Sequence, residues 1–379
     1  MRISETRFFI FASAVSPRFR TPCFDSKIRN VAPPRFPDTA DCLPDPVPHS
    51  DFVHELNRKR VPWQGVETVP IPGQYNANSA GTDILTELAS RIAGHAPSAG
   101  EHSTAIAGLL LFRRTKATAC YRAAVEPSLT VFVQGKKRMS LGGTAYVCGP
   151  SSFFLSSIDV PIESKIIEAS ENVPLLSMLL RLDMSIVREM LNREELPELE
   201  AATQRHGVAI GRASVGLLKA CSRLMELLDT PEDIPFLSHL IQREIIYRIL
   251  KTPQGARLRA IATTGDLGNR TARAISWLKA NYAKRLHMGE LAEIARMGVS
   301  TLHHQFRALT AMSPLQFQKQ LRLQKARERM LMDGMDATTA AYEVGYESVS
   351  QFNREYSRFF GQPPMRDVKA LRATGVVAA

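Results

Sequence analysis

The cysteines and histidines are the residues of this chain that could ligate a metal or act as nucleophiles. The five cysteines are Cys23, Cys42, Cys120, Cys148 and Cys221. They are scattered, odd in number and never spaced as CxxC, which argues against both a disulfide scaffold and a zinc site. His303 and His304 are adjacent, and adjacent positions of a helix point about 100° apart. We therefore do not expect these two histidines to ligate one metal ion.

The same search finds no catalytic arrangement. Metal-binding β-barrels typically use a close His-x-His pair with a carboxylate and a later histidine. The region with strand-like patterns contains only His95 and His102, and both precede its main strands. No Ser-His-Asp or Cys-His arrangement is visible. We expect no enzyme, no metal site and no cofactor, and a metal-binding enzyme of this kind is the rival class.

Positive charge is concentrated toward the C-terminus. The formal net charge is +11, which points to an anionic partner. Residues 269–379 hold about 17 Lys and Arg against about 9 Asp and Glu, whereas residues 81–190 hold about 11 against 10. This distribution is typical of a C-terminal module that binds phosphates.

The basic C-terminal part contains the pattern of a short helix, a turn and a second helix twice. The first copy predicts helices over 291–295 and 300–309, with the turn through Gly298. The second copy predicts a helix over 339–344, and Ser348 is a good N-cap for the helix that follows. The apolar side chains predicted to face inward are Leu302, Phe306 and Leu309 in the first copy and Phe352, Tyr356 and Phe359 in the second.

The two copies match in their spacing. Ala292 and Ala341 lie 49 positions apart, and Leu302 and Phe352 lie 50 positions apart. The second turn is therefore one residue longer than the first. Two matched helix-turn-helix units are much less expected by chance than one.

A long helix is predicted between the two units. Ser313 caps it, Pro314 takes its first position and it continues to about Met332. At 1.5 Å per residue its length is about 28 Å. A spacer of that size can hold two recognition helices in successive major grooves, about 34 Å apart.

The C-terminal part resembles the AraC/XylS family of transcription regulators over about residues 270–370. The matching segments are LAEIA at 291–295, SPLQFQKQLRLQKAR at 313–327 and VGYES…QFNREYSRFFGQPP at 344–364. Upstream, the chain is similar to the cupin-like N-terminal domain of one branch of that family, the AraC-type N-terminal branch. That match is looser and rests on EPSLTVFVQGKKR at 126–138, the segment Tyr146…Gly149-Pro150 and PEDIPFL at 231–237.

The resemblance implies that the second helix of each unit enters the major groove of DNA. The residues that this would present to base edges are Ser300, His303, His304, Ser350, Asn353 and Arg354. The residues better placed for phosphates are Thr301, Gln305, Gln351 and Arg358. Arginine can donate two hydrogen bonds to guanine, and asparagine or histidine can bond base edges. The alternatives are that the histidines are solvated surface residues and that Arg354 only pairs with Glu347 or Glu355.

The first turn departs from the family pattern at two positions. Arg296 stands where a glycine is usual, and Gly298 stands where a serine usually caps the second helix. Glycine is a tolerable N-cap that costs a few tenths of a kcal/mol. We therefore expect the first unit to read fewer bases than the second, which should carry at least half of the base-specific readout.

The predicted fold is α+β, in four segments. Residues 1–80 are proline-rich and predict a disordered extension, unless the start codon is assigned too early. A short apolar stretch at 8–11 faintly resembles a signal peptide. Residues 81–190 predict a cupin-like β-barrel with a hairpin at Gly142-Gly143, 191–268 a helical linker or dimerisation region, and 269–372 the tandem helix-turn-helix domain.

The resemblance also implies a small-molecule effector in the barrel. Tyr121, Arg122 and Glu126 are candidate polar contacts for it, with surface solvation as the alternative for each. The expected partners are double-stranded DNA, read in the major groove over two successive turns, RNA polymerase, the effector and a second copy of the chain. No membrane is expected, since no apolar run reaches the roughly 18 to 20 residues of a spanning helix.

The expected location is the cytoplasm, with the nucleoid. The sequence leaves activation or repression open, as it does the operator, the target genes and the identity of the effector. A sensor that acts only through protein contacts is a further alternative. Measuring specific DNA binding against salt concentration separates it from a DNA-binding regulator.

Overall fold

The structure is a computed structural model that describes residues 67–69, 79–193, 196, 206–263 and 265–373. By its internal contacts the chain divides into residues 1–62 and 63–379, and every described residue belongs to the second unit. Most of the extension predicted over 1–80 lies outside the described residues, with Cys23, Cys42 and the apolar stretch at 8–11. The prediction of disorder is wrong for β1 (Glu67–Val69), which is a strand.

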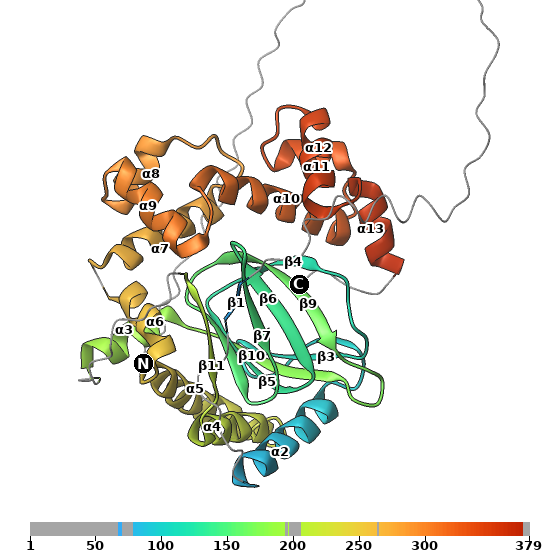
Figure 1. The fold of residues 1–379 in the computed structure, drawn as a ribbon, viewed down its shortest axis with the longest axis vertical. Helices are drawn as coiled ribbons and strands as arrows, with labels where there is room; N and C mark the ends of the chain where they lie inside the picture. Colours follow the sequence, from blue (N-terminus) through green and yellow to red (C-terminus); the bar gives the residue numbers. More distant parts are fainter. Residues whose placement is uncertain (1–66, 70–78, 194–195, 197–205, 264, 374–379) are drawn as a thin grey trace, which may run out of the picture. The chain divides into compact units, whose positions relative to one another are not determined.

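The strands form two sheets (Figure 1). The five-stranded sheet has the order β1–β7–β6–β9–β4, in which the further strands are β7 (Thr144–Cys148), β6 (Lys136–Leu141), β9 (Val160–Glu168) and β4 (Tyr121–Val125). The six-stranded sheet has the order β11–β8–β5–β10–β3–β2, in which the strands are β11 (Val208–Arg212), β8 (Ser152–Ser156), β5 (Ser128–Gln134), β10 (Leu175–Arg181), β3 (Leu109–Arg114) and β2 (Gly100–Ser103). The pair β1–β7 is parallel and the other pairs are antiparallel.

The β-structure is a sandwich and not a closed barrel. No strand pairing joins the two sheets within the described residues, so each sheet keeps two edge strands. Side chains from both sheets meet in between, as in the edge-on contact of Tyr146 with Phe154, whose ring centroids are 6.1 Å apart. The predicted α+β organisation, with β-structure before the helix-turn-helix part, is confirmed.

The predicted hairpin is present between β6 and β7. Gly142 and Gly143 both have positive φ, at 59° and 87°. Two such residues match the right-handed twist of the flanking strands, and glycine adopts this conformation without steric cost. The strands pair from Leu141 with Thr144 to Lys137 with Cys148.

Helices cover the outer face of the six-stranded sheet. They are α2 (Ser79–His95), α3 (Met184–Arg193), α4 (Val215–Glu226), α5 (Ile234–Leu250) and α6 (Ala256–Ala262), with short 3-10 turns at Pro231–Asp233 and Pro253–Gly255. Their apolar faces pack with outward-facing residues of β3, β5 and β10 in one hydrophobic cluster, as Leu88 and Leu217 do with Leu129. This burial is what holds the helices on the sheet.

One strand lies where only helices were expected. The sequence predicts a helical region over 191–268, but β11 pairs antiparallel with β8 along its full five residues. The run is too short and too apolar to show the alternation that identifies a strand in a sequence. The sandwich therefore includes residues beyond the boundary predicted at 190.

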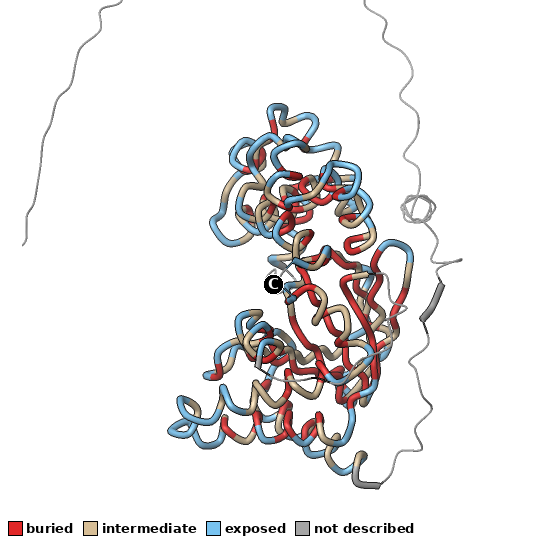
Figure 2. Tube along the Cα trace, turned by 90° about the vertical axis from the view of Figure 1, so that its left-hand side faces the viewer, coloured by how far each residue is buried: buried red, intermediate tan, exposed pale blue. Residues whose placement is uncertain are grey.

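The C-terminal part is entirely helical in the described residues. Its helices are α7 (Leu267–Ala280), α8 (Met288–Ala295), α9 (Val299–Thr310), α10 (Pro314–Met332), α11 (Ala337–Glu343), α12 (Val349–Phe360) and α13 (Pro364–Ala373). The long helix α10 begins as predicted. The Ser313 hydroxyl accepts from the backbone N–H of Gln316, and the Gln316 side-chain oxygen accepts from the backbone N–H of Ser313. Figure 2 shows that buried residues concentrate in the strands and along the inner sides of the helices.

Candidate nucleic-acid interface

The first helix-turn-helix unit consists of α8 and α9. Ala292 and Ala295 on α8 are buried, and so are Leu302 and Phe306 on α9, for which the sequence pattern predicts it. Arg296 ends α8 in the left-handed region, with φ of 52°, and its N–H donates to the carbonyl of Glu293. Glycine adopts this conformation without a Cβ penalty, which explains why glycine is usual there.

The other side of α9 is open to solvent. Ser300, Thr301, His303 and His304 are exposed, and Gln305 is half-buried. Within the described residues, neither histidine has an ion pair or a hydrogen bond, and no group of three potential metal ligands occurs. Gly298 takes the N-cap position without a side-chain hydrogen bond.

The second unit consists of α11 and α12. Asp336 caps α11 by accepting from the backbone N–H groups of Thr338 and Thr339. The turn contains Gly345, with φ of 88°. Ser348 then caps α12, its hydroxyl accepting from Gln351 N at 3.3 Å.

An aromatic cluster closes the core of the second unit. Phe352 and Tyr356 are fully buried as predicted, whereas Phe359 is half-buried. The rings of Phe352 and Tyr356 lie 5.5 Å apart, and those of Tyr356 and Phe360 lie 4.5 Å apart. The Tyr356 hydroxyl donates to Asp367 at 2.8 Å, so the polar end of the buried ring has a partner.

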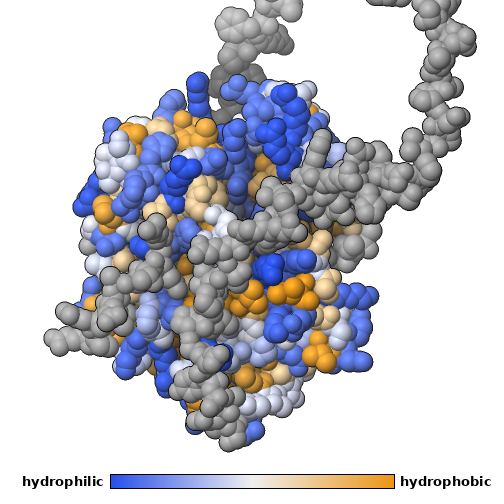
Figure 3. Space-filling view, in the orientation of Figure 1, coloured by the Kyte–Doolittle hydropathy of each residue, from blue (hydrophilic) through white to orange (hydrophobic). Residues whose placement is uncertain are grey.

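The exposed side of α12 carries Ser350, Gln351, Asn353, Arg354 and Arg358. Figure 3 shows hydrophilic side chains over the region of α11 and α12. No residue of the described chain pairs with the Arg354 guanidinium in an ion pair or a hydrogen bond. The Arg354 guanidinium is thus a charged group on the solvent side of the helix that has no partner among the described residues.

Glu355, the suggested alternative partner of Arg354, is engaged elsewhere. It accepts from Lys319 at 2.9 Å, from the Tyr346 hydroxyl at 2.9 Å and from the Gln351 side chain at 3.1 Å. Burial alone would raise the pKa of Glu355, but these donors outweigh it and leave the pKa below its ordinary value. Glu355 therefore joins α12 to α10 and leaves Arg354 free for an external acceptor.

The three candidate effector residues lie on or just after β4, and two of them contact the C-terminal helices. Arg122 pairs with Glu163 at 2.6 Å, donates to the carbonyl of Phe359 at the end of α12, and lies 4.5 Å from the Phe359 ring. Tyr121 lies below the ammonium of Lys137, at 5.6 Å. The structure thus joins Arg122 to a recognition-helix end, which the sequence did not predict.

Glu126 likewise joins the sandwich to a C-terminal helix. It pairs with Lys279 of α7 at 3.2 Å and with Arg181 at 3.4 Å, and Lys279 also pairs with Asp159 at 2.5 Å. Burial lowers the pKa of Lys279, but the hydrogen bond and charge of Asp159 and the charge of Glu126 outweigh it, so the pKa is raised. Lys279 is therefore a firmly charged link between α7 and the sandwich.

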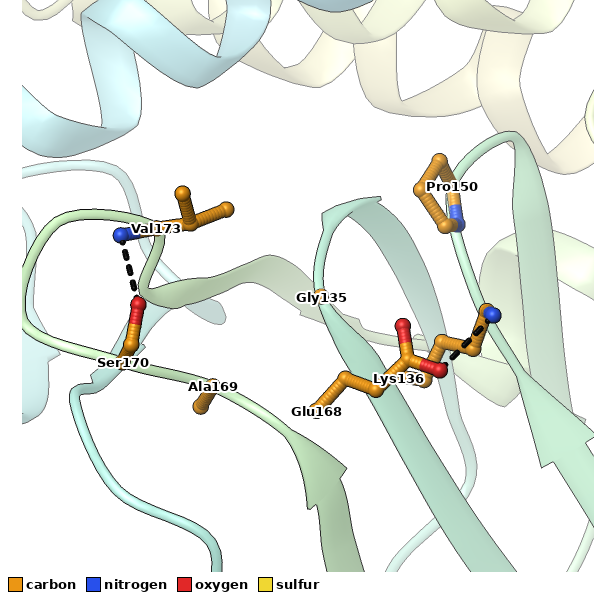
Figure 4. A pocket seen from close by; sticks show the side chains of 7 residues that line it. All are labelled: Gly135, Lys136, Pro150, Glu168, Ala169, Ser170 and Val173. Atoms are coloured by element: carbon orange, nitrogen blue, oxygen red, sulfur yellow. Dashed lines mark hydrogen bonds and ion pairs between the residues drawn. The ribbon is translucent and has the colours of Figure 1, made fainter.

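A surface hollow of about 290 Å³ lies elsewhere on the sandwich (Figure 4). Its lining residues are Gly135, Lys136, Pro150, Glu168, Ala169, Ser170 and Val173. Lys136 and Glu168 form an ion pair of 2.8 Å beside it, and Ser170 accepts from Val173 N at 3.0 Å. None of the three candidate effector residues lines this hollow.

No helix in the described part of the chain has the length and apolar character needed to cross a membrane.

Two family models match the chain. Residues 105–257 match the model described as AraC-type transcriptional regulator N-terminus, and residues 291–369 match the model described as helix-turn-helix domain. The matches correspond to the sandwich with its helices and to the two helix-turn-helix units.

Curated relatives match part of the chain. HTH-type transcriptional activator RhaS of Pectobacterium carotovorum is 32% identical over 98 residues, which are 26% of this chain and 34% of that protein. RhaS of Yersinia pestis is 29% identical over 153 residues, which are 40% of this chain and 53% of that protein. The chain thus spans between a third and about half of the length of these relatives.

A crystal structure of an apo ToxT variant from Vibrio cholerae is similar in fold. It covers 70% of this chain and 99% of ToxT, with a TM-score of 0.51 and 10% sequence identity. The likeness extends over both the β-structure and the helical part. In both matched regions, and in their order along the chain, the protein is thus similar to AraC-type transcription regulators.

Proposed function

We propose that this chain is a sequence-specific transcription regulator that binds double-stranded DNA. The observation that carries the proposal is the pair of exposed polar faces on α9 and α12, each on the second helix of a helix-turn-helix unit. The 19-residue helix α10 lies between the two units, and a helix of that length measures about 28 Å. This is close to one turn of the duplex, so two successive major grooves are within reach.

The proposed contacts follow from side-chain chemistry. Arg354 donates two hydrogen bonds to a guanine edge, and Asn353, Ser350, Ser300, His303 and His304 bond other base edges. Thr301, Gln305, Gln351 and Arg358 bond phosphates, which fixes the position of the protein without specifying a sequence. Gln351 also donates to Glu355, so its side chain is already oriented along the helix.

We infer that the sandwich binds a small-molecule effector and passes its state to the helices. The support is the match of residues 105–257 to an AraC-type N-terminus and the polar contacts that Arg122 and Glu126 make with α12 and α7. Arg122 and Glu126 would then respond to the effector through strand β4, with Tyr121 as a further polar contact. A ligand that binds the folded chain raises its Tm, and this shift should disappear in a variant that has lost the effector site.

We also propose RNA polymerase and a second copy of the chain as partners. The curated relatives are named activators, which favours activation and hence a contact with RNA polymerase. A homodimer is suggested by three exposed apolar residues on α5, Phe236, Leu237 and Leu240, which are 72%, 41% and 54% exposed. A regulator of this kind works where the DNA is, so we propose the cytoplasm and the nucleoid.

Genome-wide footprinting with the purified full chain tests the proposal. We expect protection at a limited set of sites, each with two half-sites about one duplex turn apart. The genes beside those sites would indicate the effector. Uniform, sequence-independent protection, or none at all, would overturn the proposed function.

A further inference from the structure

The long helix α10 belongs to two hydrophobic cores at once. Its first half contributes Phe317 and Leu321 to the cluster that contains the first helix-turn-helix unit. Its second half contributes Leu323, Ala326 and Met330 to the cluster of the second unit. The two clusters meet on this helix, between Leu321 and Leu323. Contacts made at this junction therefore fix one unit relative to the other.

Arg322 lies at that junction, between Leu321 and Leu323. Its guanidinium donates to four backbone carbonyls: Tyr282 at 2.8 Å, Ala283 at 3.1 Å, Lys284 at 2.9 Å and Gly345 at 2.7 Å. The first three lie in the loop that leads into the first unit. The fourth lies in the turn of the second unit. A single side chain therefore bridges the two units.

Gln318, one turn earlier on the same face of α10, also binds the loop that leads into the first unit. Gln318 is 2% exposed, and its side-chain N–H groups donate to the carbonyls of Tyr282 at 3.1 Å and Lys284 at 2.7 Å. Gln318 does not reach the second unit in any recorded hydrogen bond of the described residues. The hydrogen bond to the Gly345 carbonyl comes from the Arg322 guanidinium.

The two bridged segments also touch directly. Gly345 has φ of 88°, and a Cβ added there would lie 2.1 Å from the carbonyl oxygen of Ala283. Only glycine allows this approach, because any side chain would collide with the facing backbone. The contact brings the carbonyls of Ala283 and Gly345 close enough for one guanidinium to bind both.

The bridge continues to the recognition helix of the second unit. The Arg322 guanidinium lies 5.9 Å from the ring of Tyr346, whose hydroxyl donates to Glu355 on α12 at 2.9 Å. Lys319, one turn earlier on α10, pairs with the same carboxylate at 2.9 Å. Glu355 is the residue directly after Arg354, so the junction on α10 determines where the base-reading face of α12 lies.

We propose that Arg322 is a positioning residue that fixes the second unit relative to the first and thereby sets the spacing of the two half-sites that the chain binds together. The inference rests on the proposed DNA-binding function. Arg322 itself faces protein carbonyls and touches no base. Its loss therefore leaves each recognition helix intact and loosens only the geometry between them.

Two linked binding modules gain affinity because the second contact is intramolecular. The gain is greatest when the linkage matches the separation of the two sites and falls when the modules are free to reorient. Lysine cannot replace the guanidinium, since it lacks the planar fork that binds several carbonyls at once. Arg322→Met and Arg322→Lys should therefore weaken the coupling between half-sites in the same direction.

The experiment measures binding of the full chain to a series of duplexes built on one footprinted site. The duplexes are the intact site, each half-site alone, and sites with base pairs inserted or deleted between the halves. The wild type should prefer one spacing. Arg322→Met should bind the intact site about tenfold more weakly, show a flattened dependence on spacing, and bind each half-site alone as the wild type does.

Lys325→Met is the matched control, because Lys325 lies on the same helix and its recorded ion pair is with Glu328 of that helix. It should keep the wild-type spacing preference. Arg322→Lys serves if Arg322→Met proves unfolded by circular dichroism. A variant of Arg322 that keeps a sharp spacing preference overturns the inference, as does equal weakening on the intact site and on each half-site. Absence of specific binding by the wild type would instead refute the proposed function.

Discussion

The two helix-turn-helix units repeat one sequence pattern but are stabilised by different local devices. In the first, Arg296 occupies a left-handed position and Gly298 leaves the N-terminus of α9 without a side-chain cap. In the second, Gly345 takes the left-handed turn and Ser348 caps α12. The second unit therefore follows the local rules that the first one breaks.

The units differ equally in what surrounds them. The first shares a hydrophobic cluster with the interior of the sandwich, in which Phe306 and Leu309 belong with Phe132 and Phe154. The second has a cluster of its own around Phe352 and Tyr356. The poorer local sequence of the first unit is thus offset by packing against the sandwich interior. The second unit has its own caps and aromatic core, and Arg122 joins it to the sandwich at Phe359.

The largest effects should come from removing the central ring of each unit. Phe306→Ala and Phe352→Ala should each lower the free energy of unfolding by about 3–5 kcal/mol, because both side chains are fully buried. Hydrogen exchange should distinguish them. Phe306→Ala should reduce amide protection in the sandwich strands as well as in α9, and Phe352→Ala should reduce it only in the second unit.

Phe236→Ala is the control for both, since Phe236 is 72% exposed and should change the stability by less than about 0.5 kcal/mol. Equal loss of sandwich protection in Phe306→Ala and Phe352→Ala would show that the two cores are not independent.

Removing the free guanidinium of α12 should have the next largest effect. Arg354→Ala should weaken binding to the specific site by about 1–3 kcal/mol and relax the preference at one base pair, as loss of a bidentate base contact does. His303→Ala should cost less, because a histidine makes fewer hydrogen bonds to a base edge. The measurement is a set of equilibrium titrations against the site and its single base-pair variants.

Arg212→Ala provides the matched control for Arg354→Ala, because Arg212 is an exposed arginine on β11 of the sandwich. It should bind specific DNA as the wild type does. Unchanged binding by Arg354→Ala would show that α12 does not read the site in the way proposed.

The caps should give effects of opposite sign in the two units. Ser348→Ala should lower the free energy of unfolding by about 1 kcal/mol, because Gln351 N loses its acceptor. Gly298→Ser should raise it by a few tenths of a kcal/mol, since the backbone there is extended and a Cβ would meet only Thr301 Oγ1, at 4.0 Å. Denaturant titrations measure both, and a loss of stability in Gly298→Ser would contradict the comparison.

A further effect should be a pH dependence confined to the second unit. The pKa of Glu355 is lower in the folded chain than its ordinary value of 4.5. Its stabilising contribution is therefore present above pH 4.5 and is lost as the pH falls through the folded pKa. The difference in stability between wild type and Glu355→Gln should shrink on acidification, from at most about 1 kcal/mol because the group is partly solvated.

The sequence predicts the second unit better than it predicts the contacts between units. Ser348 as a cap, Phe352 and Tyr356 as core and the start of α10 at Pro314 follow from local rules, and the structure agrees. β1 and β11 are missed because three and five residues carry no readable period.

The polar contacts of Arg122 and Arg322 could not be predicted from the sequence either, and the reason is different. Arg122 and Phe359 are 237 positions apart, and nothing in either local sequence indicates that they meet. Arg322 carries a weak signal, since a cation between Leu321 and Leu323 on a helix that is apolar on two faces suggests a buried partner. Its partners are backbone carbonyls, which no sequence pattern distinguishes from one another.

The most direct test measures the affinity of the full chain for one footprinted site across a range of salt concentrations. It also measures the affinity for the same site with either half-site scrambled. A DNA-binding regulator should show a steep linear fall of log K with log salt. Scrambling the half-site read by α12 should cost more affinity than scrambling the half-site read by α9, because the second unit presents Arg354 and the better-formed turn. Equal affinity for the site and for both scrambled duplexes would show that the two units do not read the DNA sequence.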